Sequence, residues 1–231
     1  MDAATSLREL RKSRGWSQAE AARHLRVSQP YLSLLEAGER PLTPHLRRLL
    51  LQRLKLPPTV LPLPASLDDW PPFTNEAFVR YLSALGYPPY SYVKPHPRPE
   101  NPTALLLWTL NAPDAEPRLV EGLPWILLSY PDLDLDWLLR EAKLHDLQNR
   151  LGFFVQLAHT VATTNGRYAS RAAALADLLQ TLEHSRLARE ETLFREATTA
   201  KQLEITRVLR GPEAAHWNLV TLWKPEALRY E

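Results

Sequence analysis

The feature that most constrains the fold is a run of residues, 17–40, that reads as two short helices joined by a tight turn. Ser17, followed three residues later by Glu20, has the spacing of a capping box, in which side chain and backbone at a helix start bond reciprocally. Ser28 is a second N-cap candidate, and Pro30 suits the first turn of the helix that follows. The run therefore carries two helix starts within a dozen residues.

Apolar residues of this run recur at helical spacing and predict a shared inner face. They are Ala19, Ala22, Leu25, Val27, Leu32 and Leu35. Val27 falls in the turn as an apolar plug, and Gly38 followed by Pro41 predicts the end of the second helix. Two helices joined in this way can place the second one in the DNA major groove. A helical hairpin used only for protein contact is the alternative.

From about Ser6 to Leu56 the chain resembles the phage-repressor family of helix-turn-helix proteins (Cro/repressor type, also called XRE). The matching positions are Gln18, Ala22, Val27, Ser28, Leu32, Leu35, Glu36 and Gly38. Arg26 departs from the pattern, because the family commonly has Gly at this turn position, where a left-handed backbone disfavours other residues. The resemblance implies an N-terminal domain of four or five helices.

The resemblance also implies roles for individual residues. Those on the groove-facing side of the second helix, which would read bases, are Gln29, Pro30, Ser33 and Leu34. Those that would contact phosphates are Ser17, Gln18 and Arg40. Gln29 could pair bidentately with adenine, while Pro30 and Leu34 could touch a thymine methyl group. Arg11 and Glu36 match a pair that forms an internal salt bridge in related repressors.

Charge is distributed unevenly along the 231 residues, although the net charge is only +2. Residues 1–56 hold 11 Lys and Arg against 5 Asp and Glu, a net +6, whereas residues 57–231 hold 17 against 21, a net −4. A basic small domain beside an acidic larger one is expected if only the first meets phosphate. We therefore expect double-stranded DNA, with a palindromic operator, to be the partner of residues 1–56.

Several function classes lack their sequence signals. The chain has no cysteine, which excludes disulfides and thiolate zinc sites and is compatible with a reducing cytoplasm. No Gly-rich phosphate loop, nucleophile elbow or metal-ligand spacing is present, so we expect no metal, no cofactor and no enzymatic activity. Without a signal-peptide pattern or an apolar run near the roughly 20 residues that span a bilayer, we expect a cytoplasmic protein.

Three parts follow one another along the chain: the helix-turn-helix domain 1–56, a Pro-rich linker 57–69, and a larger, mostly helical domain 70–231. The predicted fold class is thus mainly α. In the larger domain we expect a helix over 75–85, a segment 103–110 that is either helix or strand, and a short helix within 116–130 interrupted at Pro124. Residues 87–102 are expected to form an ordered, extended, proline-rich loop.

Two longer helices are expected further on. Asp136 is predicted to cap a helix that runs to about Ala162, with a close neighbour at Gly152. Ser170 is predicted to cap a helix towards Arg210, which either breaks near 186–191 or serves as an intermolecular arm. The segment 217–222 is expected to dock back onto the domain.

Polar clusters in the larger domain favour structural roles over chemistry. Asp132, Asp134 and Asp136 alternate, but the Gly and Glu of a calcium loop are missing, so capping explains them better. The other cluster, expected in mid-helix, is His145, Asp146, Gln148 and Asn149. Its His145 and Asn149 could share a helix face and read a ligand or partner, although a solvated or internally bonded face is the simpler interpretation.

The leading hypothesis is a sequence-specific transcriptional regulator, most simply a repressor, that acts as a homodimer. A first alternative is an antitoxin or defence-system regulator whose C-terminal domain binds a partner protein. Residues 135–139 and 149–153 are faintly similar to the C-terminal part of abortive-infection-type antitoxins. A second alternative, an enzyme within residues 70–231, is disfavoured by the missing motifs.

Overall fold

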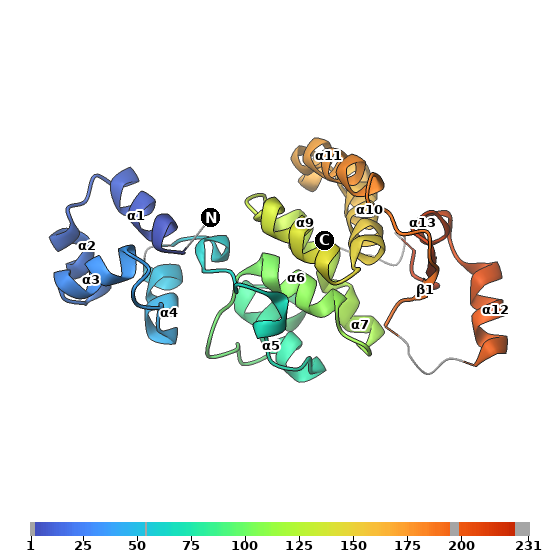
Figure 1. The fold of residues 1–231 in the computed structure, drawn as a ribbon, viewed down its shortest axis with the longest axis horizontal. Helices are drawn as coiled ribbons and strands as arrows, with labels where there is room; N and C mark the ends of the chain where they lie inside the picture. The colour runs from blue at the N-terminus through green and yellow to red at the C-terminus, as the bar shows by residue number, and fades with distance from the viewer. Residues whose placement is uncertain (1–2, 54, 195–198, 225–231) are drawn as a thin grey trace. The chain divides into compact units, whose positions relative to one another are not determined.

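Helices make up most of the structure, a computed structural model that describes residues 3–53, 55–194 and 199–224 (Figure 1). The expected mainly α fold class is confirmed. Contacts between Cα atoms divide the chain into two compact units. The first unit comprises 1–65 and 80–105, and the second unit comprises 66–79 and 106–231. These units differ from the predicted three-part division chiefly at 80–105, which packs with the N-terminal helices.

Four helices form the N-terminal part of the first unit: α1 (Ala3–Ser13), α2 (Gln18–Leu25), α3 (Gln29–Glu36) and α4 (Pro44–Arg53). Their buried side chains make one small core from Leu7, Ala21, Ala22, Leu25, Leu32, Leu35, Leu46 and Leu50. The 3-10 helices η1 (Pro58–Val60) and η3 (Pro88–Tyr90) also belong to this unit. The predicted linker 57–69 is thus partly structured, and Leu61 and Leu67 within it are buried.

Two helices cross the boundary between the units, α5 (Asn75–Leu85) and α6 (Pro102–Leu110). The helix expected over 75–85 is present, and the ambiguous segment 103–110 is helical. In α6 every side chain is buried. Its apolar residues are therefore not confined to one face of the helix, and the sequence shows no helical periodicity there. That uniform burial explains why pattern alone left helix and strand open there.

The second unit is built around α10 (Gln148–Thr164), whose middle residues are almost entirely buried. The surrounding elements are η2 (Leu67–Asp69), α7 (Pro117–Val120), α8 (Gly122–Ser129), α9 (Leu135–Leu144), η4 (Gly166–Arg171), α11 (Ala172–Glu183), α12 (Ala200–Leu209) and α13 (Pro212–His216). Strands β1 (Glu191–Thr192) and β2 (Leu219–Val220) form a short parallel pair, with Glu191 opposite Leu219.

Three helix predictions were wrong in detail. The helix expected from Asp136 to Ala162 is two helices, because Asp146 adopts a left-handed backbone (φ 57°) between α9 and α10. The cap of α9 is Asp134, whose Oδ1 accepts a hydrogen bond from the Trp137 N–H at 3.0 Å. Pro124 lies inside α8, near its start, where a missing N–H costs little; the interruption falls at Glu121.

The long helix expected after Ser170 ends at Glu183, just short of the stretch 186–191 where one alternative placed a break. Ser170 itself lies in η4 and does not cap α11.

The tail docks as expected: Trp217 is fully buried and its ring occupies the space that a Cβ on Gly152 would take. Within the described residues, no helix combines the length and apolar character needed to cross a membrane.

Candidate nucleic-acid interface

The start of α2 is fixed by the predicted capping box. Ser17 Oγ accepts the Glu20 N–H at 3.2 Å, and the Glu20 carboxylate accepts the Ser17 N–H at 2.7 Å. Hydrogen bonds from the Ser17 N–H and from the Ser17 side chain to the Glu20 carboxylate hold the pKa of Glu20 below its ordinary value, because they favour the ionised form. The first turn of α2 is therefore set before any ligand is present.

The turn between α2 and α3 adopts the left-handed conformation at Arg26, with φ 56° and ψ 42°. Arg26 thus takes a geometry that glycine adopts more readily than other residues. Val27 donates its N–H to the Ala22 carbonyl at 3.0 Å and packs against the small core. Ser28 Oγ then accepts the Tyr31 N–H at 3.3 Å and starts α3. The turn and the cap together fix the direction in which the N-terminus of α3 points.

The residues expected to read bases lie along one side of α3. Gln29 and Pro30, at its N-terminal end, are exposed, while Ser33 and Leu34 are half-buried. Leu32 and Leu35 occupy the opposite, buried side. Of the residues expected to contact phosphates, Ser17 and Arg40 are exposed and Gln18 is half-buried.

A chain of side-chain hydrogen bonds links α3 back to α1. Gln29 Nε2 donates to Gln18 Oε1 at 2.9 Å, and Gln18 Nε2 donates to Glu36 Oε2 at 3.2 Å. Arg11 donates to both carboxylate oxygens of Glu36, at 2.7 and 3.1 Å. Sequence reasoning missed the Gln18–Gln29 bond; its only signal is a glutamine at the start of each helix. The bond fixes the direction of both amides.

Glu36 accepts the hydrogen bonds at the centre of this network, and its carboxylate is buried. Burial alone would raise its pKa, but hydrogen bonds from Arg11 and Gln18 and the charge of Arg11 outweigh burial and lower the pKa below its ordinary value. Arg8 also donates to the Glu36 backbone carbonyl, at 2.9 Å. The ionised Glu36 therefore ties α1, α2 and α3 together.

Exposed basic side chains are frequent in the first unit around the helix-turn-helix motif. The exposed ones in the first unit near this motif in sequence are Arg8, Lys12, Arg14, Arg23, Arg26, Arg40 and Arg48. Their concentration gives this part of the chain the charge that a phosphate backbone attracts. In contrast, Arg47 is buried in α4 and serves packing rather than solvent contact.

The polar cluster at 145–149 in the second unit has a structural role. His145 and Asn149 do not share a helix face, since the chain breaks at Asp146. Asn149 is buried, and its side chain donates to the Leu187 carbonyl at 3.0 Å and accepts the Leu187 N–H at 2.9 Å. The nitrogen and the oxygen of the Asn149 side chain thus both bond the segment after α11.

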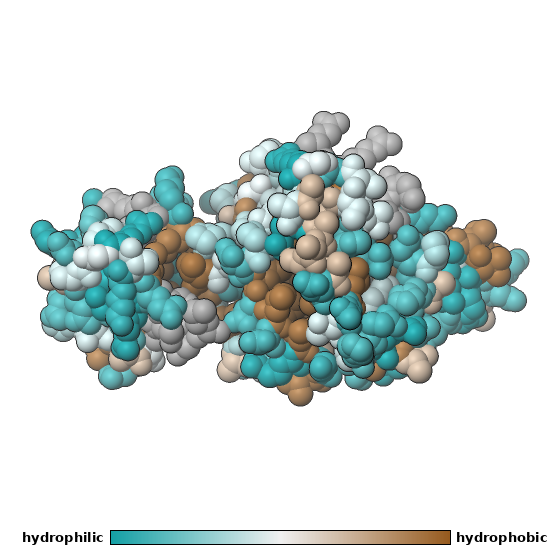
Figure 2. Space-filling model, turned by 90° about the horizontal axis from the view of Figure 1, so that it is seen from above, coloured by the Kyte–Doolittle hydropathy of each residue, from teal (hydrophilic) through white to brown (hydrophobic). Residues whose placement is uncertain are grey.

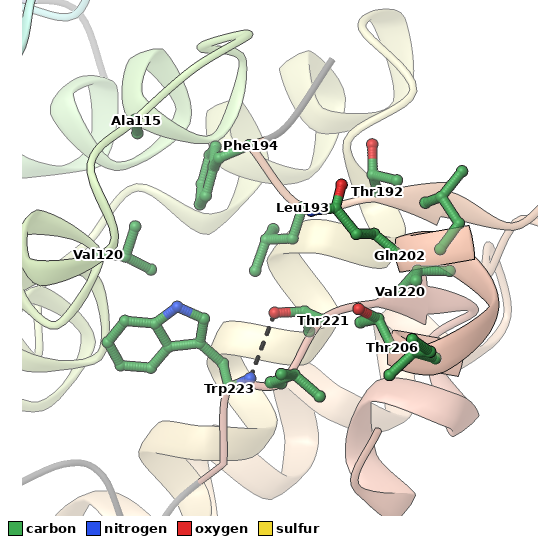
Figure 3. Close-up of a pocket in the computed structure, with 13 residues that line it drawn as sticks. Ala115, Val120, Thr192, Leu193, Phe194, Gln202, Thr206, Val220, Thr221 and Trp223 are labelled. Carbon is green, nitrogen blue, oxygen red and sulfur yellow. Dashed lines mark hydrogen bonds between the residues drawn. The ribbon is translucent and has the colours of Figure 1, made fainter. Parts of the chain in front are cut away.

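The second unit also contains a cavity of about 460 Å³ beside α12 and β2. Figure 3 shows Leu193, Phe194 and Trp223 around its apolar part, with Thr206 and Gln202 contributed by α12. The described residues that line it include no charged side chain. Such a cavity is suited to an uncharged, largely apolar molecule.

A family model described as a helix-turn-helix domain matches residues 2–63. No curated protein matches the chain. No solved structure matches it either. The capped helix pair, its fixed turn and this match together define residues 2–63 as a helix-turn-helix domain, the class of module that binds DNA.

Proposed function

We propose that the protein is a sequence-specific transcriptional regulator that binds double-stranded DNA with α3 in the major groove. The observation that carries this proposal is the exposed amide of Gln29 at the start of α3, held in one direction by Gln18. Bidentate reading of adenine requires an amide whose oxygen and one N–H both meet the base edge. The Gln29 amide has two N–H groups, so one can bond Gln18 while the other faces the base.

The neighbouring residues would complete the reading of bases. The Pro30 ring and the Leu34 side chain offer apolar surface to a thymine methyl group, and Ser33 offers a hydroxyl that accepts or donates. This surface has few hydrogen-bonding groups. Part of the specificity is therefore assigned to the sequence-dependent shape of DNA.

Phosphate contacts would come from the start of α2 and from the loop after α3. Because the Gln18 side chain bonds Gln29 and Glu36, its phosphate contact would use the backbone N–H, supported by the positive end of the α2 dipole. Ser17 is exposed at the same helix start, and Arg40 supplies an exposed guanidinium.

The second unit would serve regulation rather than catalysis. Its uncharged cavity favours binding of a small effector, and its exposed apolar residues favour contact with a second copy of the chain. The simplest role is a homodimeric repressor on a palindromic operator. An antitoxin or defence-system regulator, in which this unit binds a partner protein, is the alternative role for the same DNA-binding domain.

The test is selection of binding sites from random duplexes with the full chain, followed by footprinting. Gln29→Ala with Ser33→Ala should lose affinity for the selected site by about 10- to 100-fold and leave binding to random DNA nearly unchanged. Arg40→Ala should weaken both kinds of binding similarly, because a phosphate contact carries no sequence information.

The matched control removes the same side-chain groups from the second unit: Gln180 and Ser170 are exposed, and their replacement by Ala should leave both affinities unchanged. If selection yields no enriched site, sequence-specific binding is wrong. If Arg40→Ala relaxes specificity as much as the double variant, the division into base and phosphate contacts is wrong.

A further inference from the structure

A buried ion pair attaches the proline-rich segment 91–100 to α4 of the first unit. Arg47 Nη1 lies 2.6 Å from Glu100 Oε2, and the two side chains are only 7% and 11% exposed. The same nitrogen donates to the Pro99 carbonyl at 3.4 Å, and Arg47 Nε donates to the Leu42 carbonyl at 3.4 Å. One guanidinium thus joins segment 91–100 to the loop that follows α3.

That loop is the one expected to contact phosphate, since Leu42 comes two residues after Arg40. The segment 91–100 lies outside the helix-turn-helix match, which ends at residue 63. It nevertheless belongs to the same compact unit. The attachment therefore ties segment 91–100 to the loop that carries Arg40.

The backbone of segment 91–100 is held at several points. Ser83 Oγ donates to the Val93 carbonyl at 2.7 Å, and the His96 N–H donates to the Arg80 carbonyl at 2.9 Å. The His96 ring lies 3.9 Å from the Tyr81 ring, centre to centre. Prolines at 95, 97 and 99 restrict the backbone further. A segment fixed in this way loses little conformational freedom when it binds.

The charged side chains that this segment exposes are basic. Arg98 is 54% exposed and pairs through Nε with the second Glu100 oxygen at 2.7 Å. Lys94 is exposed as well. Glu100 lies between two guanidiniums, so the group of Arg47, Arg98 and Glu100 keeps a net positive charge. Arg98 is the exposed member of this group. Together with Lys94, it gives the segment two cations that face solvent.

The charge of the whole first unit agrees with this arrangement. Residues 1–65 and 80–105 contain 14 Lys and Arg against 6 Asp and Glu, a net +8. The remaining residues contain 14 against 20, a net −6. Adding 80–105 to the helix-turn-helix domain therefore sharpens the separation of charge between the units.

We infer that residues 94–98 form a second DNA-contacting element, in which Lys94 and Arg98 bind backbone phosphates next to those contacted by the loop after α3. The inference rests on the proposed DNA binding and extends it beyond the helix-turn-helix domain. Contacts of this kind add affinity and salt dependence without sequence preference.

The experiment removes both cations from the full chain with Lys94→Gln and Arg98→Gln. The Arg47–Glu100 pair remains in this variant, and thermal unfolding checks that it folds. Lys143→Gln with Lys201→Gln is the matched control, because it removes the same charge from exposed positions of the second unit. Fluorescence anisotropy gives the affinity for a short duplex of random sequence over a range of NaCl concentrations.

The variant should bind about tenfold more weakly at low salt, and the slope of log K against log salt should decrease by about 1 to 2, since each lost phosphate contact contributes about 0.9. The control should keep the wild-type slope. A wild-type slope in the Lys94/Arg98 variant, together with a reduced slope in Arg40→Ala, would overturn this inference alone. Failure of the wild-type chain to bind any duplex would overturn the proposed function as well.

Discussion

At the scale of single residues, Glu36 connects stability to the proposed reading of DNA. Its carboxylate holds Arg11 on one side and Gln18 on the other, and Gln18 in turn orients Gln29. A buried carboxylate of this kind contributes stability only while it is ionised and paired. Loss of its charge would therefore affect both the packing of three helices and the direction of the amide proposed to read adenine.

Glu36→Gln should lower the free energy of unfolding at about pH 7 by about 2 to 3 kcal/mol, since it leaves Arg11 without its anion. The folded-state pKa of Glu36 is depressed, whereas in the unfolded chain this group has the ordinary pKa of a glutamate. The wild-type advantage is therefore complete above the unfolded pKa and is lost as the pH falls through the folded pKa.

Urea unfolding at neutral and acidic pH measures this difference. The control is Glu39→Gln, which removes an exposed carboxylate nearby and should change stability by less than about 0.5 kcal/mol. A gap between wild type and Glu36→Gln that persists at the acid end would contradict the ionic explanation.

At the scale of elements, a close contact between Trp217 and α10 helps to dock the tail of the second unit. Trp217 is fully buried after α13, and its ring rests on the backbone of α10 at Gly152. Glycine is required there because the ring occupies the place of a Cβ. The contact also sets the position of β2, two residues further on, and so of one wall of the cavity.

Gly152→Ala should destabilise the second unit by about 2 kcal/mol, because the added methyl group meets a rigid ring in a packed interior. Thermal unfolding monitored by tryptophan fluorescence measures the loss and the displacement of Trp217. Gly166→Ala is the control: a Cβ there meets no atom within 4 Å, so stability should stay nearly constant. Equal effects of the two substitutions would show that the Trp217 contact is not the cause.

At the scale of the whole molecule, the two units differ in charge and in exposed apolar surface. Only the first unit carries a charge suited to DNA, whereas α12 in the second unit exposes Ile205, Val208 and Leu209. Figure 2 shows hydrophobic side chains gathered on the surface over α12. Exposed apolar patches commonly mark interaction sites. A palindromic operator needs two copies of the chain with recognition helices about 34 Å apart, so we assign this surface to a second copy.

Val208→Asp should therefore turn a dimer into a monomer in sedimentation equilibrium, since it places a charge on a side chain that is 78% exposed in the single chain. Affinity for a palindromic site should fall more than affinity for a half-site. Leu144→Asp is the control, because Leu144 is 68% exposed on α9, away from α12 in the chain. A wild-type chain that sediments as a monomer at micromolar concentration would exclude this role for α12.

Local chemistry made the N-terminal elements predictable. The capping box at Ser17 and the cap at Ser28 depend on bonds between residues a few positions apart. The break at Asp146 was not predictable in the same way, because apolar spacing continues through it from α9 into α10. A left-handed backbone at a residue other than glycine does not change the spacing of apolar residues, so hydrophobic periodicity does not reveal it.

The amino-acid sequence by itself determined the capped helix pair and its basic surroundings, since these follow from short-range hydrogen bonds and from where Lys and Arg occur. Only the tertiary structure decided that Gln18 bonds Gln29 and that Arg47 pairs with Glu100, 53 residues away. Contacts across such separations depend on how the whole chain closes upon itself. No spacing rule along the sequence contains that information, and the extended DNA-contacting surface inferred above depends on it.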